Sequence, residues 1–255
     1  MKKNYFCALL TVALVVACFR VQAQTVVKVA AAANLRYAME EIETMYESEN
    51  SGIDLQINYG ASGMFFQQIS HGAPYNLFLS ADEEFPSQLK SLNQTEGDPK
   101  VYACGKLALY SLNMADVKSR GLEILKDAGV KRIAIANPRT APYGERSVDL
   151  LEDMGLWGEL ESKVIYGESI SQAAQFATTG NTDLGFLALS LLLNPNVKLT
   201  GSYYIIPDEL YTPIAQAGVV IKQSCSTAQA QAFFDYILSP ACSGVWDKYG
   251  YSTMK

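Results

Sequence analysis

The stretch that decides the fold runs from residue 25 to residue 63 and reads TVVKVAAAANLRYAMEEIETMYESENSGIDLQINYGASG. It begins with an apolar run over 25–32, which predicts a strand. Over 35–48 the apolar residues recur at helical spacing, and over 53–59 they alternate with polar residues, as in a half-buried strand. Strand, helix and strand in this order predict a parallel βαβ unit whose helix packs on one face of a sheet.

The alternation of strands and helices continues along the chain. A short helix over 64–70 and a buried strand over 77–79 complete a first set of elements. A second set follows, with helices expected near 121–128, 143–154 and 171–178 and strands expected over 132–136, 164–166 and 184–187. This pattern predicts parallel sheets with helices on both faces.

Two long extended runs, over 101–111 and 213–222, lie between the two sets of elements. They indicate a chain that crosses from one lobe to another and then returns. We therefore predict an α/β protein with two lobes, joined by hinge strands around a central ligand cleft. One lobe is expected to comprise residues 24–103 and 211–255, and the other residues 104–210.

The composition excludes several classes of protein. The 255 residues are 49% hydrophobic and 18% charged, which excludes a disordered chain. The formal net charge is −6, and no cluster of Lys and Arg is present, so we expect no nucleic-acid partner. The only histidine, His71, cannot build a multi-histidine metal site, and its position before Gly72 indicates a surface residue.

The first 23 residues are predicted to be a signal peptide. Lys2 and Lys3 precede an apolar run over 6–18, which at 13 residues is too short to anchor the chain in a bilayer. We favour cleavage after Ala23. Residues 15–18 also resemble a lipobox, whose processing would leave a lipidated Cys18 and anchor the protein at the cell membrane. Removal of residues 1–23 changes the charge balance to 17 − 26 = −9.

Three cysteines follow the signal peptide: Cys104, Cys225 and Cys242. A helical pattern of about a dozen residues separates Cys225 from Cys242 and would hold them roughly 18 Å apart. That separation is too long for a disulfide. We expect the three thiols to be small buried hydrophobic groups.

The turns between strands and helices carry the candidate binding residues of the first lobe. In parallel sheets, ligands lie beyond the carboxyl ends of the strands, where helix N-termini present free N–H groups and a positive dipole end. The first turn contains Ala33 and Asn34, and the second contains Ser62 between two glycines. Small residues let a ligand approach the backbone, while Asn34 and Ser62 add polar groups. Both residues have an alternative interpretation as helix N-caps.

Two further turns belong to the second lobe. Tyr143 follows Pro142, which suits the first turn of a helix, and its phenol is an unusual choice for a cap. Its alternative role is packing. In the fourth turn, Ser169 and Gln172 form a capping box, and the backbone N–H of Ile170 would face the cleft. Together the four helix starts, with small or hydroxyl residues spread over both lobes, indicate a cleft that binds an oxyanion.

Other polar and aromatic residues have structural interpretations. The acidic run Asp82, Glu83 and Glu84 is typical of a first helical turn rather than of a metal site. Trp157 and Trp246 are expected in the core. Arg139 lies in the third turn and keeps an organic acid open as an alternative ligand, because an arginine commonly clamps a carboxylate.

A series of segments occurs in the order VAAAANL, YGASG, GAPYNLFLSAD, the NP…APYG turn, DLGFLA and FFDYILSPACSGVWDKYGY. In these segments the chain resembles a known family, the periplasmic molybdate-binding proteins of molybdate ABC importers. The resemblance covers about residues 25–252. It implies the two-lobed fold of type II periplasmic binding proteins, with molybdate or tungstate held between the lobes by neutral hydrogen bonds.

The resemblance also implies the site residues. Asn34 and Ser62 match ligand-binding positions of the family, with Ala33 beside them. Ile170 replaces a valine whose backbone N–H binds the anion. Some members use a tyrosine at the position of Ala188, so Tyr143 is expected to supply the hydroxyl that is missing there. On this view, Tyr143→Phe weakens binding and leaves the stability of the ligand-free protein almost unchanged.

The function implied is the capture of molybdate, and of tungstate as well, for delivery to a membrane permease. The ligand is molybdate itself, held through its oxygens, with no resident metal and no cofactor. The protein is expected to be exported, monomeric and not an enzyme, because no nucleophile stands beside a base. The alternative is a binding protein of the same fold for another anion, such as sulfate or a small organic acid.

Overall fold

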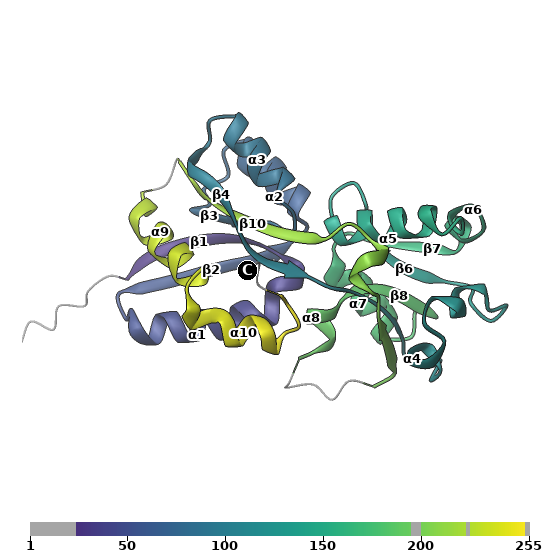
Figure 1. The fold of residues 1–255 in the computed structure, drawn as a ribbon. Helices are drawn as coiled ribbons and strands as arrows, with labels where there is room; N and C mark the ends of the chain where they lie inside the picture. The colour runs from purple at the N-terminus through teal and green to yellow at the C-terminus, as the bar shows by residue number, and fades with distance from the viewer. Residues whose placement is uncertain (1–23, 195–199, 223–224, 253–255) are drawn as a thin grey trace, which may run out of the picture.

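A computed structural model describes residues 24–194, 200–222 and 225–252 as two α/β lobes, each built around a five-stranded sheet (Figure 1). The expected signal peptide, including Cys18, lies outside the described residues. Within the described part of the chain, no helix is long and apolar enough to cross a membrane.

Lobe 1 contains the sheet with strand order β2-β1-β3-β10-β4. Its strands are β1 (Thr25–Ala32), β2 (Ile53–Gly60), β3 (Leu77–Leu79), β4 (Thr95–Gly105) and β10 (Ile214–Ile221). Its helices are α1 (Arg36–Glu49), α2 (Ser62–Ser70), α3 (Glu84–Ser91), α9 (Thr227–Ile237) and α10 (Ser243–Lys248), with 3-10 turns η1 (Ala33–Leu35) and η5 (Pro240–Cys242). β1 runs parallel to β2 and β3, whereas β10 runs antiparallel to β3 and β4.

Lobe 2 contains the sheet with strand order β7-β6-β8-β5-β9. Its strands are β5 (Leu107–Ser111), β6 (Ile133–Ala136), β7 (Val164–Gly167), β8 (Leu184–Ala188) and β9 (Ser202–Ile205). Its helices are α4 (Val117–Arg120), α5 (Pro142–Asp153), α6 (Trp157–Leu160), α7 (Ile170–Thr178) and α8 (Leu189–Leu192), with η2 (Gly121–Lys126), η3 (Glu161–Lys163) and η4 (Asp208–Leu210). β6 runs parallel to β7 and β8, and β5 runs antiparallel to β8 and β9.

The predicted α/β fold with two lobes is confirmed, but the sheets are mixed rather than parallel. The extended run over 101–111 is not one strand: β4 and β5 meet at Lys106 and belong to different sheets. The return crossing lies over 206–213, before β10. The two extended runs expected from the sequence, 101–111 and 213–222, are mainly apolar. Only strand pairing decides which sheet each part of them joins. The limits proposed for the lobes, 24–103 with 211–255 and 104–210, stay a prediction.

The single helix expected near 121–128 is also replaced by two shorter elements. The chain forms α4 and then the 3-10 turn η2, because Gly121 between them adopts a positive φ of 56°, which ends an α-helix. The acidic run over 82–84 predicts the start of α3 (Glu84–Ser91), whereas the sequence patterns missed β9.

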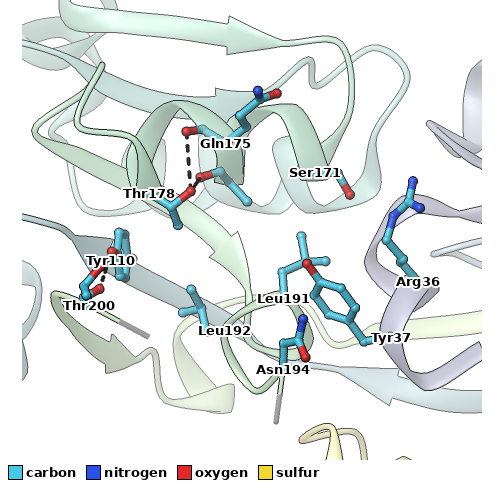
Figure 2. Close-up of a pocket in the computed structure, with 11 residues that line it drawn as sticks. Arg36, Tyr37, Tyr110, Ser171, Gln175, Thr178, Leu191, Leu192, Asn194 and Thr200 are labelled. Atoms are coloured by element: carbon cyan, nitrogen blue, oxygen red, sulfur yellow. Dashed lines mark hydrogen bonds between the residues drawn. The ribbon is translucent and has the colours of Figure 1, made fainter. Parts of the chain in front are cut away.

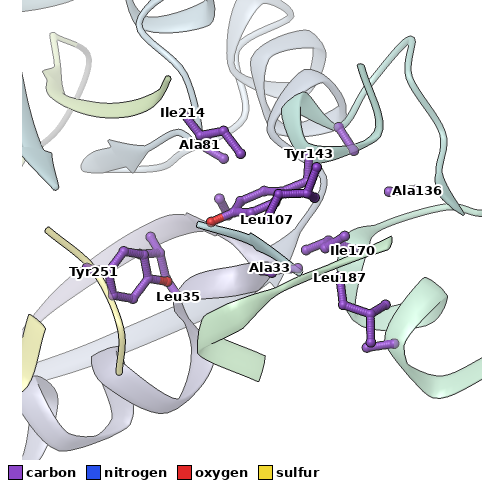
Figure 3. Close-up of a cluster of buried hydrophobic side chains, with 14 of the residues drawn as sticks. Ala33, Leu35, Ala81, Leu107, Ala136, Tyr143, Ile170, Leu187, Ile214 and Tyr251 are labelled. Atoms are coloured by element: carbon purple, nitrogen blue, oxygen red, sulfur yellow. The ribbon is translucent and has the colours of Figure 1, made fainter. Parts of the chain in front are cut away.

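The main hydrophobic core is continuous between the lobes at the hinge. Figure 3 shows Tyr143 of α5 and Leu107 of β5 among its members, together with Ala33 and Ile170. Residues of both sheets belong to this one buried cluster. The facing ends of the two lobes are therefore packed together.

An acidic cluster lies on α1 and the neighbouring strand β2. Burial, followed by the charges of Glu47, Glu40 and Asp54, raises the pKa of the Glu43 carboxyl from its ordinary value of 4.5 to about 7. The folded protein therefore keeps a proton that the unfolded chain releases. Stability is expected to fall as the pH rises from about 4.5 to about 7.

Glu43→Gln is expected to stabilise the protein at pH 8, because an amide cannot ionise in this position. We expect the Tm to rise by roughly 2–4 °C, the change that about 1 kcal/mol produces in a domain of this size. The difference from the wild type should vanish at pH 4. Thermal unfolding followed by circular dichroism at both pH values measures it, and an equal shift at pH 4 and pH 8 would contradict the titration of Glu43.

Candidate functional site

The four strand-to-helix turns selected from the sequence meet in one small cavity between the lobes. In lobe 1, β1 leads into η1 and β2 leads into α2. In lobe 2, β6 leads into α5 and β7 leads into α7. The cavity is lined by Ala32, Ala33, Asn34, Gly60, Ala61, Ser62, Ala81, Ala141, Pro142, Tyr143 and Ile170. All five candidate residues are thus brought together, as expected for the carboxyl ends of parallel strands.

The lining of this cavity carries no charged side chain among the described residues. Its volume is about 10 Å³, which is close to the room that a single water molecule needs. Arg139 is exposed and does not line it. Ala188 is buried at the end of β8 and does not line it either.

Asn34 is buried in η1, and its side chain does not cap a helix. Its Nδ2 donates to Gln216 Oε1 at 2.9 Å and to Tyr251 Oη at 2.9 Å. Its Oδ1 is buried without a hydrogen-bond partner. The interpretation of Asn34 as an N-cap is therefore wrong. Because the side-chain amide hydrogens are used within the protein, the backbone N–H is the donor that Asn34 can offer to a ligand.

Ser62 is the first residue of α2 and is 1% exposed. Its hydroxyl makes no capping bond, so the N-cap interpretation is wrong here too. Instead, Oγ accepts the backbone N–H of Ala81 at 3.0 Å. An oxygen that accepts this bond keeps its own hydrogen for another acceptor. Ser62 therefore offers an O–H donor and a free backbone N–H at a helix start.

Tyr143 extends from the start of α5 to the hinge strands. Its hydroxyl accepts a hydrogen bond from Gln216 Nε2 of β10 at 3.1 Å. The hydroxyl lies against Gly105 at the end of β4, where a Cβ atom would overlap it. Burial, followed by the nearby Tyr251 and Tyr211, raises the pKa of Tyr143 well above its ordinary range. The phenol consequently stays protonated and is a permanent donor.

Ile170 begins α7, and the capping box beside it is confirmed in part: Ser169 caps the helix, but the Gln172 side chain accepts the N–H of Glu168 rather than that of Ser169. Ser169 Oγ accepts the N–H of Gln172 at 3.3 Å, and Gln172 Oε1 accepts the N–H of Glu168 at 2.7 Å. The next residue, Ser171, donates its hydroxyl to Ala33 O across the lobes at 3.1 Å. The N–H of Ile170 is left without an intrahelical acceptor at the helix start.

The lobes also touch at the entrance of α2. Gly63 N–H donates to Thr140 O at 2.8 Å. A Cβ atom at Gly63 would lie 2.9 Å from Thr140 Cα, so only glycine permits this approach.

Sequence reasoning missed Ala81 and Gln216. Ala81 follows β3 and lies in the cavity wall. Gln216 is buried within β10, whose sequence IAQAGVVI is otherwise apolar. A single polar residue inside an apolar strand is a signal that could have identified Gln216.

The remaining assignments divide as follows. His71 is exposed and Trp246 is buried, as predicted, whereas Trp157 is only partly buried. Asp82 Oδ1 accepts the N–H of Phe85 at the start of α3, which fits the structural interpretation of the acidic run. Burial also raises the pKa of Asp82 to about 6. The described ranges contain no group of three or more His, Cys, Asp or Glu side chains that could hold a metal ion.

The cysteines differ partly from expectation. The thiols of Cys104, Cys225 and Cys242 are free. Cys242 is buried as predicted, but Cys225 is exposed and Cys104 is half-buried. The prediction of three buried thiols is therefore wrong for two of them.

A wider cavity of about 420 Å³, shown in Figure 2, has Ser171 of α7 in its lining. It is lined by Arg36 and Tyr37 of α1, by one side of α7 and by Leu191 and Leu192 of α8. None of the five candidate residues lines it. The smaller cavity is the candidate site because the helix starts converge there.

Two lobes with an uncharged cavity between them define a solute-binding protein. The family model for bacterial extracellular solute-binding proteins matches residues 27–252, so the chain belongs to this family. The resemblance predicted from the sequence motifs is confirmed by relatives within it. The molybdate-binding protein ModA of Azotobacter vinelandii is 39% identical to this chain, over 88% of this chain and 89% of that protein. ModA of Rhodobacter capsulatus is 37% identical, over 88% and 87% of the two chains.

Solved structures agree with this assignment. The periplasmic molybdate-binding protein of Azotobacter vinelandii matches with a TM-score of 0.85 at 32% identity, covering 90% of this chain and all of that one (100%). The sulfate-binding protein SubI of Mycobacterium tuberculosis matches with a TM-score of 0.78 at 13% identity, covering 91% and 88% of the two chains. The second likeness shows a shared fold alone.

Proposed function

We propose that this chain is an extracytoplasmic binding protein that captures molybdate between its lobes and delivers it to the permease of an ABC importer. The observation that carries the proposal is the cavity itself, an uncharged pocket at which helix starts from both lobes converge. The relatives that are 39% and 37% identical are named molybdate-binding proteins, which supports this ligand.

The proposed donors are neutral. They are the backbone N–H groups at Ala33, Asn34, Ser62 and Ile170, together with the hydroxyls of Ser62 and Tyr143. Helix-start N–H groups and the positive end of the helix dipole favour an anion without any charged side chain. In a dry cavity such preoriented dipoles act more strongly than in water.

The same chemistry selects among ligands. Molybdate and tungstate are fully ionised tetrahedral anions that only accept hydrogen bonds, so both suit a site made of donors. A protonated phosphate would need an acceptor, and no carboxylate lines the described cavity wall. An organic acid would favour an arginine, and Arg139 is exposed away from this wall.

The remaining features follow from this role. We propose a monomeric binding protein rather than an enzyme, because Ser62 has no base beside it and His71 lies exposed at the far end of α2. No cofactor or nucleic-acid partner is proposed, and the acidic net charge of −6 agrees with that. The protein is proposed to be periplasmic after cleavage following Ala23, or lipid-anchored if processing leaves Cys18 as the first residue.

The lobes are proposed to separate and close around the anion. A cavity of about 10 Å³ does not accept a metal atom with four oxygens unless its walls move. The hinge strands β4 and β10 run toward lobe 2 side by side (Figure 1), so rotation about them opens the cavity.

A thermal-shift screen tests the proposed function. The chain without residues 1–23 is heated in the presence of molybdate, tungstate, sulfate, phosphate or small carboxylates. A ligand at a hundredfold excess over its Kd stabilises the native state by about 2.7 kcal/mol. We expect clear shifts with molybdate and tungstate, whereas a shift with carboxylates or sulfate and none with molybdate would overturn the proposal.

Ser62→Ala and Tyr143→Phe each remove one proposed hydroxyl donor. A hydrogen bond to a charged ligand contributes roughly 1.5–3 kcal/mol, so we expect the molybdate Kd to rise about ten- to a hundredfold in either variant. Titration calorimetry measures the change. Tyr203→Phe, on the edge strand β9, is the matched control, and equal affinities in Tyr143→Phe and in this control would remove Tyr143 from the site.

The structure corrects one part of the expectation for Tyr143→Phe. The variant leaves Gln216 Nε2 buried without its acceptor, so the ligand-free protein should lose roughly 1–3 kcal/mol rather than stay unchanged. Urea unfolding in the absence of anions measures this loss.

Gly63→Ala should oppose closure, because the added Cβ lies 2.9 Å from Thr140 Cα on the facing lobe. Overpacking of about 1–3 kcal/mol in the closed state raises the molybdate Kd roughly five- to a hundredfold. Gly244→Ala is the control, since a Cβ at this helical glycine meets nothing within 4 Å. Small-angle scattering at a fixed molybdate concentration should give a larger radius of gyration for Gly63→Ala than for the control. Identical curves and affinities would contradict the closure argument.

A further inference from the structure

Gln216 is a fully buried polar residue that is not among the proposed ligand-binding residues. Its side chain is 0% exposed, and it does not line the anion cavity. It lies on the hinge strand β10, at an irregularity where the pairing with β4 shifts register between Gln216 and Ala217. A buried carboxamide in an apolar strand is costly unless its hydrogen bonds are made.

The hydrogen bonds of Gln216 join residues of both lobes. Oε1 accepts from Asn34 Nδ2 at 2.9 Å and faces Tyr102 Oη at 3.2 Å. Nε2 donates to Tyr143 Oη at 3.1 Å. Gln216 therefore bridges a cavity residue of lobe 1 and a cavity residue of lobe 2.

This arrangement determines the direction of the Tyr143 hydroxyl. A phenol has one hydrogen, and Gln216 leaves that hydrogen free because it donates to the phenol oxygen. A carboxamide turned the other way would present Oε1 instead and would take up the hydrogen of Tyr143. The donor Asn34 Nδ2 opposes that turn, because it would then face a second NH₂ group. Gly105 leaves room for the arrangement, since a Cβ there would overlap both Tyr143 Oη and Gln216 Nε2.

We propose that Gln216 is a positioning residue of the anion site, which donates to Tyr143 so that the phenol hydrogen points to the bound oxyanion. It touches no ligand itself. The inference rests on the proposed function, because it needs an anion to receive the hydrogen. It adds a residue of the hinge to the determinants of affinity.

A double-mutant cycle tests the proposal. Gln216→Met keeps the approximate shape of the side chain and removes both polar ends. Molybdate Kd values are measured by titration calorimetry for the wild type, Gln216→Met, Tyr143→Phe and the double variant. Gln56→Met, at an exposed position of β2, is the matched control. Far-ultraviolet circular dichroism and thermal unfolding verify that each variant is folded.

The cycle should be strongly non-additive. We expect Gln216→Met to raise the Kd about tenfold or more in the wild-type background and less than twofold in the Tyr143→Phe background. Equal effects of Gln216→Met in both backgrounds would mean that Gln216 acts through general packing, and would overturn the proposal. No effect in the wild-type background would overturn it as well.

Gln216→Glu supplies a rescue experiment. When protonated, the carboxyl has the shape of the native side chain and still donates to Tyr143, whereas the ionised form can only accept. At pH 5.5 Gln216→Glu should bind molybdate at least fivefold more tightly than Gln216→Met. At pH 8.5 Gln216→Glu should bind molybdate more weakly than it does at pH 5.5. Equal affinities of the two variants at pH 5.5 would overturn the proposal. The protonated carboxyl of Gln216→Glu can donate to Tyr143 and Met cannot, so equal affinities would mean that this hydrogen bond does not matter. If the wild type binds no molybdate, the proposed function fails together with this inference; if it binds and the rescue is absent, only the inference fails.

Discussion

Hydrogen bonds across the lobes hold the walls of the cavity together, and one of them runs from Ser190 Oγ of α8 to Asn34 O at 2.8 Å. Gly63 N–H donates to Thr140 O, Ser171 Oγ donates to Ala33 O, and Gln216 Nε2 donates to Tyr143 Oη. Each bond joins a helix start, turn or hinge strand of lobe 1 to the beginning of a helix or to the preceding turn in lobe 2. The cavity has walls from both lobes, so the position of one lobe relative to the other determines its size.

The proposed site attracts an anion mainly through backbone N–H groups at helix starts rather than through charged side chains. The chain carries a net charge of −6, so long-range attraction does not bring an anion to it. In the proposed site, attraction arises at short range, from helix-start N–H groups and from the hydroxyls of two residues that line the cavity. Small residues such as Ala33, Ala61 and Ala141 line the wall and let the backbone approach a ligand. Asp82 lies nearby, but its carboxylate caps α3 and does not enter the wall.

Below the cavity, a buried polar network determines which groups are free to donate. Asn34 uses its amide hydrogens on Gln216 and Tyr251, and Tyr102 donates to Ser80 O at 2.6 Å. Ser62 receives a hydrogen bond from Ala81 and keeps its own hydrogen. Binding groups and supporting groups are thus distinguished by the direction of each hydrogen bond rather than by residue type. A buried network of this kind is sensitive to the loss of any one member.

The sequence by itself determined most of the fold and identified the candidate residues that line the cavity. Hydrophobic periodicity located β1, α1, β2 and the repeated strand–helix units, because local patterns follow the geometry of each element. Small and hydroxylated residues at strand ends identified Asn34, Ser62, Tyr143 and Ile170, because parallel strands bring their carboxyl ends together. Only the tertiary structure decided that β4 and β5 separate at Lys106, since strand pairing is a long-range property. It also decided that Asn34 and Ser62 are not caps: their partners Gln216 and Ala81 lie 182 and 19 residues away along the chain, and no local pattern specifies a hydrogen bond over such distances.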